Sequence, residues 1–312
     1  MTTSPTASGA ASQRLKDLFA RAADTFGSSV HAIGPDDWHL PTPCTAWDVR
    51  ALVDHVVGEH RWVVPLLAGQ TIADVGDELS GDLLGPDPVA AHDEAAAPSK
   101  AAVAGADLTA ITHLSFGDVP AEEYIRQLLA DLVVHGWDLS RALGRDERLD
   151  PEAVAEVAGW FVDREDLYRQ AGAIGPRPSG TDPVDPQDRL LVDFGRNPST
   201  DDTLSVITRF NRAFGRRDVD AVMALMTEDV VFEDTSPPDG RRHAGRAAVR
   251  AAWEEFFASS PRTHFVTEEG IVTDDRAAYR WRFDWDGGHV RGVDVFRVRD
   301  GKVAEKLSYV KG

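Results

Sequence analysis

Residues 120–142 constrain the fold of this chain most, because one long amphipathic pattern there carries side chains that bind metals. Leu128 and Leu132 belong to a row of leucines three or four positions apart, which predicts a helix with one buried stripe. Asp131 and His135 recur at the same spacing and therefore share a face of that helix. An acid and an imidazole four residues apart can both reach a single ion.

A second helix is expected upstream, from Thr45 to about residue 63. The run Thr45–Asp48 has the form of a capping box, in which a hydroxyl and a carboxylate satisfy each other's backbone amides. His55 lies on the apolar face of this helix, beside Leu52 and Val56. Such a histidine is either a core residue bonded to a carbonyl or a third metal ligand. Three protein ligands plus water are typical of a catalytic metal site.

The segments 42–62 and 131–138 together resemble actinobacterial metal-binding proteins related to mycothiol-dependent maleylpyruvate isomerase, which are DinB/YfiT-like four-helix bundles. The resemblance extends over residues 13–195. It implies that His55, Asp131 and His135 bind a divalent metal, zinc or nickel, and that mycothiol is a cosubstrate. The isomerase has Glu where this chain has Asp131, so the metal could sit differently or bind more weakly.

The remainder of the chain divides into a predicted disordered tail over 1–12, a linker over 196–200 and a second domain over 201–312. The linker follows a segment, 190–196, that is expected to be extended. Within 201–312, helical patterns come first and alternating strand patterns follow, with a hairpin turn at Asp300-Gly301. This order predicts an α+β domain with one curved, mostly antiparallel sheet. The fold class is therefore multidomain: an all-α four-helix bundle followed by an α+β cone.

The second domain resembles the SnoaL-like, nuclear transport factor 2-like cone, and within it ketosteroid isomerase. Val231–Asp234 aligns with the strand that supplies the general base of that enzyme, so the resemblance implies this role for Asp234. Gly292–Arg297 aligns with the strand that supplies the carboxylic acid of its oxyanion hole, which implies that role for Asp294. Phe210 falls where the enzyme has a tyrosine. Loss of one oxyanion donor costs about 100- to 1,000-fold in rate, which argues against ketosteroid isomerisation itself.

Composition and charge exclude several classes of partner. The 312 residues carry a formal net charge of −19, which repels nucleic acids and anionic membrane surfaces. No run of about 18 apolar residues exists that would span a membrane. The single cysteine, Cys44, excludes an intramolecular disulfide and fits a reducing cytoplasm. The expected partners are a small-molecule substrate and, as the resemblance to the SnoaL-like domain implies, a second copy of the chain.

Three functions remain open, and the sequence favours the first. In the first, a metal held by the bundle activates a small thiol or water against a small organic substrate. In the second, the cone is a metal-independent cyclase, isomerase or hydrolase that uses Asp234 and Asp294, because two carboxyls in an apolar pocket can take different protonation states. In the third, the protein is not an enzyme but a ligand-binding module.

Overall fold

The structure is a computed structural model that describes residues 7–180, 182–260 and 262–311. Contacts between Cα atoms divide the chain into two compact units. The first contains residues 1–33, 50–139 and 147–196, and the second contains 34–49, 140–146 and 197–312. Part of the predicted disordered tail, residues 1–6, lies outside the described residues, and residues 7–12 belong to the first helix.

The first unit is mainly helical and also contains one short hairpin. Its helices are α1 (Ala7–Val30), α2 (Val49–Leu67), α3 (Ile72–Val75), α4 (Pro88–Gly105), α5 (Ala121–Ala142), α6 (Pro151–Phe161), α7 (Glu165–Gln170) and α8 (Pro186–Asp193). The hairpin pairs β1 (Ile111–Leu114) with β2 (Gly117–Pro120) in antiparallel register. Strands this short had no clear signature in the sequence.

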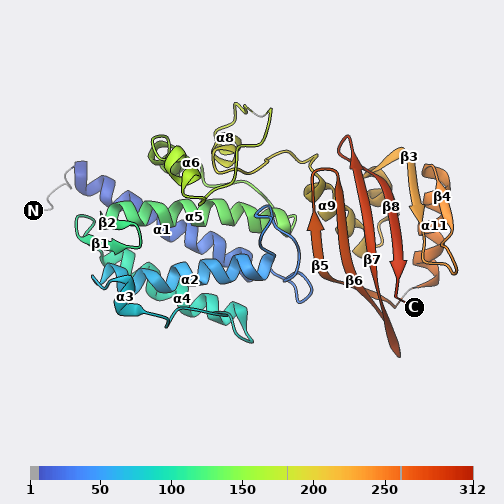
Figure 1. Ribbon diagram of the computed structural model, residues 1–312, viewed down its shortest axis with the longest axis horizontal. Helices are drawn as coiled ribbons and strands as arrows, with labels where there is room; N and C mark the ends of the chain where they lie inside the picture. Colours follow the sequence, from blue (N-terminus) through green and yellow to red (C-terminus); the bar gives the residue numbers. More distant parts are fainter. Residues whose placement is uncertain (1–6, 181, 261, 312) are drawn as a thin grey trace, which may run out of the picture. The chain divides into compact units, whose positions relative to one another are not determined.

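The four long helices α1, α2, α4 and α5 pack along one another as a bundle (Figure 1). Ring contacts join α1 to α2 through Phe19 and His60, and α2 to α4 through His60 and His92. The buried face of α5 includes Leu129 and Trp137, which are almost fully excluded from solvent. The leucine spacing therefore predicted both the helix and its buried stripe.

Two local expectations in this unit were wrong. Residues 190–193 are helical rather than extended, because they belong to α8. Asp185 caps this helix by accepting from the backbone amides of Gln187 and Asp188, and Pro186 takes the first helical position.

The second helix begins at Val49 rather than Thr45. Residues 42–48 instead form a closed turn, in which the Thr42 hydroxyl donates to the Trp47 carbonyl.

The second unit is an α+β domain built on a six-stranded sheet. Its helices are α9 (Thr203–Gly215), α10 (Val219–Ala224) and α11 (Arg246–Ser259). Its strands are β3 (Met226–Glu233), β4 (Arg242–Ala244), β5 (His264–Val272), β6 (Arg276–Trp285), β7 (Gly288–Arg299) and β8 (Lys302–Val310). The strand order is β4-β3-β8-β7-β6-β5, and only β3 and β8 run parallel to each other.

The predicted fold class is confirmed: a helical region is followed by a mostly antiparallel sheet with helices on one face (Figure 1). The turn between β7 and β8 is the expected one, since Asp300 and Gly301 have φ angles of 51° and 68°. The inner face of the sheet packs against α9 and α11 through aromatic residues such as Phe210, Trp253 and Phe296. Among the described residues, no helix is both long and apolar enough to cross a membrane.

One glycine on the inner face makes room for an aromatic ring. A Cβ atom added at Gly292 would lie 2.2 Å from the Trp281 ring and 2.3 Å from the Tyr309 carbonyl oxygen. Gly292→Ala should therefore displace Trp281 and lower the free energy of unfolding by about 1–3 kcal/mol. Urea unfolding followed by tryptophan fluorescence measures this loss. The matched control is Gly215→Ala at the end of α9, where the added Cβ meets nothing within 4 Å; equal losses in the two variants would contradict the prediction.

Candidate metal centre

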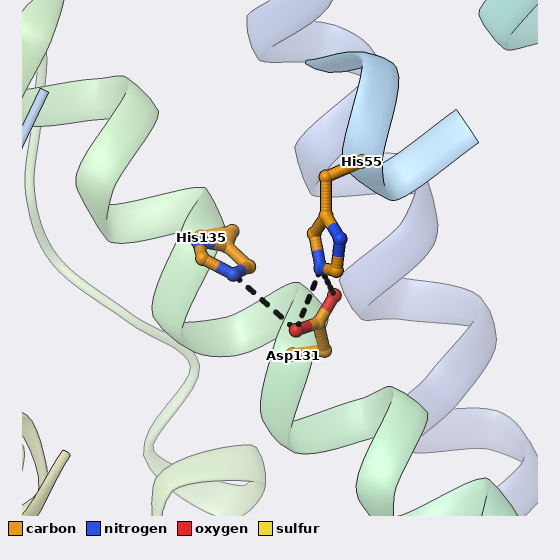
Figure 2. Close-up of side chains that lie close together, drawn as sticks. All are labelled: His55, Asp131 and His135. Carbon is orange, nitrogen blue, oxygen red and sulfur yellow. Dashed lines mark hydrogen bonds and ion pairs between the residues drawn. The ribbon is translucent and has the colours of Figure 1, made fainter. Parts of the chain in front are cut away.

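Two helices of the first unit bring the three predicted metal ligands together. His55 comes from the middle of α2, and Asp131 and His135 lie one turn apart on α5 (Figure 2). The His55 Nε2 atom is 3.1 Å from Asp131 Oδ2, and the His135 Nε2 atom is 3.3 Å from Asp131 Oδ1. Both imidazoles therefore turn the same nitrogen toward one carboxylate (Figure 2).

The spacing of these donors fits a divalent cation. One ligand atom from each residue lies within 4.8 Å of the other two. In a tetrahedral zinc site with bonds of about 2.05 Å, neighbouring ligand atoms are about 3.3 Å apart, close to the two shorter distances found here. Two imidazole nitrogens and one carboxylate oxygen are also a donor set that zinc and nickel accept. His55 and Asp131 each keep 27% of their side chain exposed, so a cation there could be reached by a further ligand.

The ionised carboxyl of Asp131 and the protonated imidazoles of His55 and His135 stabilise one another. Burial opposes ionisation of Asp131, but the imidazoles of His135 and His55 hold the pKa of its carboxyl far below the usual range. Burial would lower the pKa of His135, yet Asp131 and Asp138 raise it to about 9. The pKa of His55 is also raised, because the Asp131 carboxylate outweighs the effect of burial. The carboxylate thus attracts positive charge, whether from protons or from a cation.

A second carboxylate fixes the orientation of His135. The Nδ1 atom of His135 is 3.0 Å from Asp138 Oδ2, and the fully buried Asp138 is in turn bonded by the Arg196 guanidinium at 2.7 Å. A hydrogen bond of this kind, on the imidazole nitrogen that does not face the metal, fixes the tautomer and ring position of a ligating histidine. Asp138 was already visible in the sequence on the face of His135, whereas Arg196 lies 58 residues further on and gave no signal.

Glu59 is a functional candidate that the sequence analysis missed. It lines a narrow cavity of the first unit together with Asp131, His60 and four apolar side chains. Burial, and then the negative charge of Asp131, raise the pKa of Glu59 to about 7. Its carboxyl can therefore exchange a proton near neutral pH. The signal was available, because Glu59 follows His55 by four residues on α2, the spacing that relates Asp131 to His135.

A further pair of histidines lies inside the bundle, outside the candidate ligand set. His60 and His92 are each only 2% exposed, and the His60 Nδ1 atom is 3.0 Å from the Ser99 hydroxyl. Burial lowers the pKa of His60 to about 4 and also lowers that of His92. Both rings are therefore neutral core residues at physiological pH. The sequence does not distinguish them from His55, since all three lie on helices with apolar neighbours.

In the second unit, Asp234 is bound into a turn. Its Oδ1 atom accepts hydrogen bonds from the backbone amides of Ser236 and Arg241, both at 2.8 Å. Its Oδ2 atom lies 3.1 Å from the Arg241 guanidinium and 3.2 Å from the His243 imidazole. Burial opposes ionisation, but these donors hold the pKa of Asp234 well below its usual range. A carboxylate bonded in this way is a weak proton acceptor.

Asp294 lies in the middle of β7, on the inner face of the sheet, and pairs with a lysine. Its Oδ2 atom is 2.7 Å from the Lys306 ammonium on β8. At this distance Asp294 Oδ2 accepts a hydrogen bond from the ammonium, whereas an oxyanion hole needs a group that donates one. The two predicted catalytic carboxyls therefore have different partners: Asp234 is bonded within a turn, and Asp294 is bonded to Lys306. Lys306 was not singled out from the sequence, because lysine on an inner strand position is rare.

Comparison with known proteins relates the two parts of the chain to two families. Residues 19–140 match the mycothiol maleylpyruvate isomerase N-terminal domain, and residues 207–306 match the SnoaL-like domain. An uncharacterized protein of Mycobacterium tuberculosis, found in two strains, is 33% identical over 137 residues, which cover 44% of this chain and 71% of that protein. The solved structure of an NTF2-like protein of unknown function from Mesorhizobium loti is also similar, with 46% sequence identity and a TM-score of 0.32. The match covers 34% of this chain and 88% of the Mesorhizobium loti chain.

The buried pair of Asp138 and Arg196 provides a test of the support around His135. Asp138→Ala leaves the guanidinium of Arg196, whose side chain is 10% exposed, without its carboxylate. The free energy of unfolding should fall by about 3–5 kcal/mol, as when one partner of a buried ion pair is removed. Chemical denaturation measures the change. The control is Asp182→Ala, which breaks an exposed pair with Arg189 and should alter stability little; similar effects at both sites would contradict this account.

Proposed function

The chain belongs over residues 19–140 to the mycothiol maleylpyruvate isomerase N-terminal domain family and over residues 207–306 to the SnoaL-like domain family, and we propose that it is a metal-dependent enzyme. In this proposal His55, Asp131 and His135 hold one divalent cation, zinc or nickel. The protein then activates a small thiol of the mycothiol type, or water, against a small organic substrate.

The observation that carries the proposal is the convergence of two imidazoles on one partly exposed carboxylate. A closed structural site would use four protein ligands, whereas three leave a position for a reactant. A divalent cation held there would supply Lewis acidity and lower the pKa of a bound thiol or water. A thiol cosubstrate would be available in a reducing compartment such as the cytoplasm.

The surrounding residues have separate roles in this proposal. Asp138 and Arg196 keep the His135 ring in place, as the bond between His135 Nδ1 and Asp138 shows. Glu59 accepts the proton that a thiol or water loses and returns it to the product, which suits a carboxyl with a pKa of about 7. The small cavity that Glu59 lines with Asp131 brings this carboxyl close to the reacting group.

We assign different roles to Asp234 and Asp294, the two aspartates of the second unit that the sequence predicts to be catalytic. Asp234 stabilises the turn between β3 and β4, since both of its oxygens accept hydrogen bonds within that turn. Asp294 remains a candidate for chemistry, in partnership with Lys306, because it faces the apolar interior. The aromatic rings near Asp294 and Lys306 support a second binding region, for a flat, apolar compound, in this unit.

We further propose that the second unit forms a homodimer through the outer face of its sheet. Cross-strand pairs on β7 and β8 place Val293 beside Tyr309 and Val295 beside Leu307 on this face. None of the four is fully buried, and Tyr309 is 52% exposed. Apolar side chains in adjacent rows on one face of a sheet suit a self-complementary contact with a second copy.

The metal site is tested by metal analysis of purified protein. We expect about one zinc or nickel ion per wild-type chain and a loss of most of it in His55→Ala, Asp131→Asn and His135→Ala, because two ligands hold a divalent ion weakly. His113→Ala is the matched control, since His113 pairs with an aspartate on β1–β2 outside the candidate site. Wild-type protein that stays free of metal after incubation with zinc and with nickel would refute the proposal.

The choice between thiol and water is tested with cobalt-substituted protein. A thiolate bound to cobalt gives an intense charge-transfer absorption in the near ultraviolet, which water does not give. Mycothiol should produce this band in wild-type protein, and Glu59→Gln should make the band appear more slowly after mixing near neutral pH, because proton loss from the thiol is slower. A spectrum that does not change with mycothiol or cysteine would leave water as the activated molecule and exclude the thiol reaction.

The dimer is tested by light scattering after gel filtration. Wild-type protein should elute at twice the mass of the 34.0 kDa chain, and Leu307→Glu should shift it toward the monomer, because the new charge would be desolvated in the contact. Val184→Glu changes an exposed apolar side chain of the first unit and should leave the mass unchanged. A monomeric wild-type protein at micromolar concentration would rule out this interface.

A further inference from the structure

A lysine is buried on the inner face of the sheet in the second unit. Lys306 is 5% exposed and lies on β8 between two aromatic residues in register with it, Phe232 on β3 and Phe296 on β7. Its Nζ atom lies 5.3 Å from the centroid of Phe232 and 5.6 Å from those of Phe296 and Trp253. These distances suit attraction between a cation and ring faces.

Two oxygen groups contact the amine in addition to the rings. Lys306 Nζ donates to Ser308 Oγ at 2.6 Å and is 2.7 Å from Asp294 Oδ2. Asp294 stands directly opposite Ser308 in the β7–β8 register, so all three side chains project from the same face. Burial lowers the pKa of Lys306, although Asp294 partly opposes this effect. Amine, carboxylate and hydroxyl therefore form one compact group in aromatic surroundings.

The group has unused hydrogen-bonding capacity. The Asp294 Oδ1 atom is buried and has no hydrogen-bond partner among the described residues, and the same is true of the indole nitrogens of Trp253 and Trp281. A buried carboxylate oxygen without a partner costs free energy, so an ion pair selected for stability alone would have both oxygens bonded. The group is not sealed from solvent, since the Asp294 side chain keeps 13% exposure and Ser308 is half-buried.

We propose that Lys306 is a nucleophile that forms an iminium ion with an aldehyde or ketone, with Asp294 transferring the proton. This reaction needs neither the metal nor the residues of the first unit, and it goes beyond the function proposed above. The aromatic rings around Lys306 favour a small carbonyl compound with an apolar or aromatic body.

The residues present balance each step of the reaction. The Asp294 carboxylate takes one proton from the Lys306 ammonium, and the free amine nitrogen attacks the carbonyl carbon. The carbinolamine that results loses its oxygen as water, using the proton that Asp294 returns. Ammonium and carbonyl become iminium and water, so the net charge of the site is unchanged. The iminium keeps both the Asp294 carboxylate and the three ring faces that the ammonium had.

Reductive trapping tests the proposal on the full chain. The protein is incubated with propanal or benzaldehyde and sodium cyanoborohydride at neutral pH with a chelator present, and modified lysines are mapped by mass spectrometry. Lys306 should be alkylated several-fold faster than Lys302, an exposed lysine on the same strand, because burial lowers the pKa of Lys306 and so leaves more of it as free amine at neutral pH. The comparison is made within one protein, so it does not depend on a variant.

Two variants confirm the assignment. Lys306→Arg keeps the charge opposite Asp294 but has no nucleophilic amine, so the fast adduct should disappear while the circular dichroism spectrum is unchanged. Lys302→Arg should leave the fast adduct intact. Alkylation of Lys306 at or below the rate of Lys302 with both aldehydes would overturn the proposal, as would a fast adduct that persists in Lys306→Arg. Because the reaction is run without metal, its failure would not bear on the metal centre.

Discussion

The first unit depends on a single electrostatic constraint, the presence of carboxylates inside a helical bundle. Asp131 and Asp138 lie two turns apart on α5, and the His135 imidazole is held between them. Each carboxylate needs a second positive or donating partner to remain charged, and these come from His55 and Arg196. Helix α2, which carries His55, and the segment after α8 that carries Arg196 must therefore keep a fixed position relative to α5, and the ligand geometry follows from this requirement.

The two units solve the problem of buried charge in different ways. In the first unit, two imidazoles share one carboxylate, and a divalent cation can replace the protons that this carboxylate favours on the imidazoles. In the second unit, one carboxylate meets one ammonium and the pair is neutral, within aromatic rings that favour a cation. The first arrangement suits metal chemistry and the second suits an amine nucleophile. The proposed activities therefore need different experiments and can fail independently.

Much of the structure could be predicted from local patterns. The leucine spacing of α5, the Asp-Pro start of α6 and the alternation of β6 to β8 all have short-range causes, and the structure agrees with each. The errors also have local causes. The same Asp-Pro signal begins α8 at residues 185–186, where an extended segment was expected. At Thr45 a capping pattern was present, but a turn closed by the Thr42 hydroxyl displaced the helix start to Val49.

The sequence by itself determined which helix faces carry His55, Asp131 and His135, because helical periodicity fixes the side on which a residue lies. It also indicated that helices dominate the first unit and that helices precede most of the strands in the second unit. Only the tertiary structure decided which groups meet. Arg196 reaches Asp138, and Lys306 reaches Asp294, across separations that no local pattern encodes. The charge state of a carboxyl depends on such neighbours within a few ångströms, so the assignment of Asp294 as an acid could be examined only once Lys306 was seen beside it.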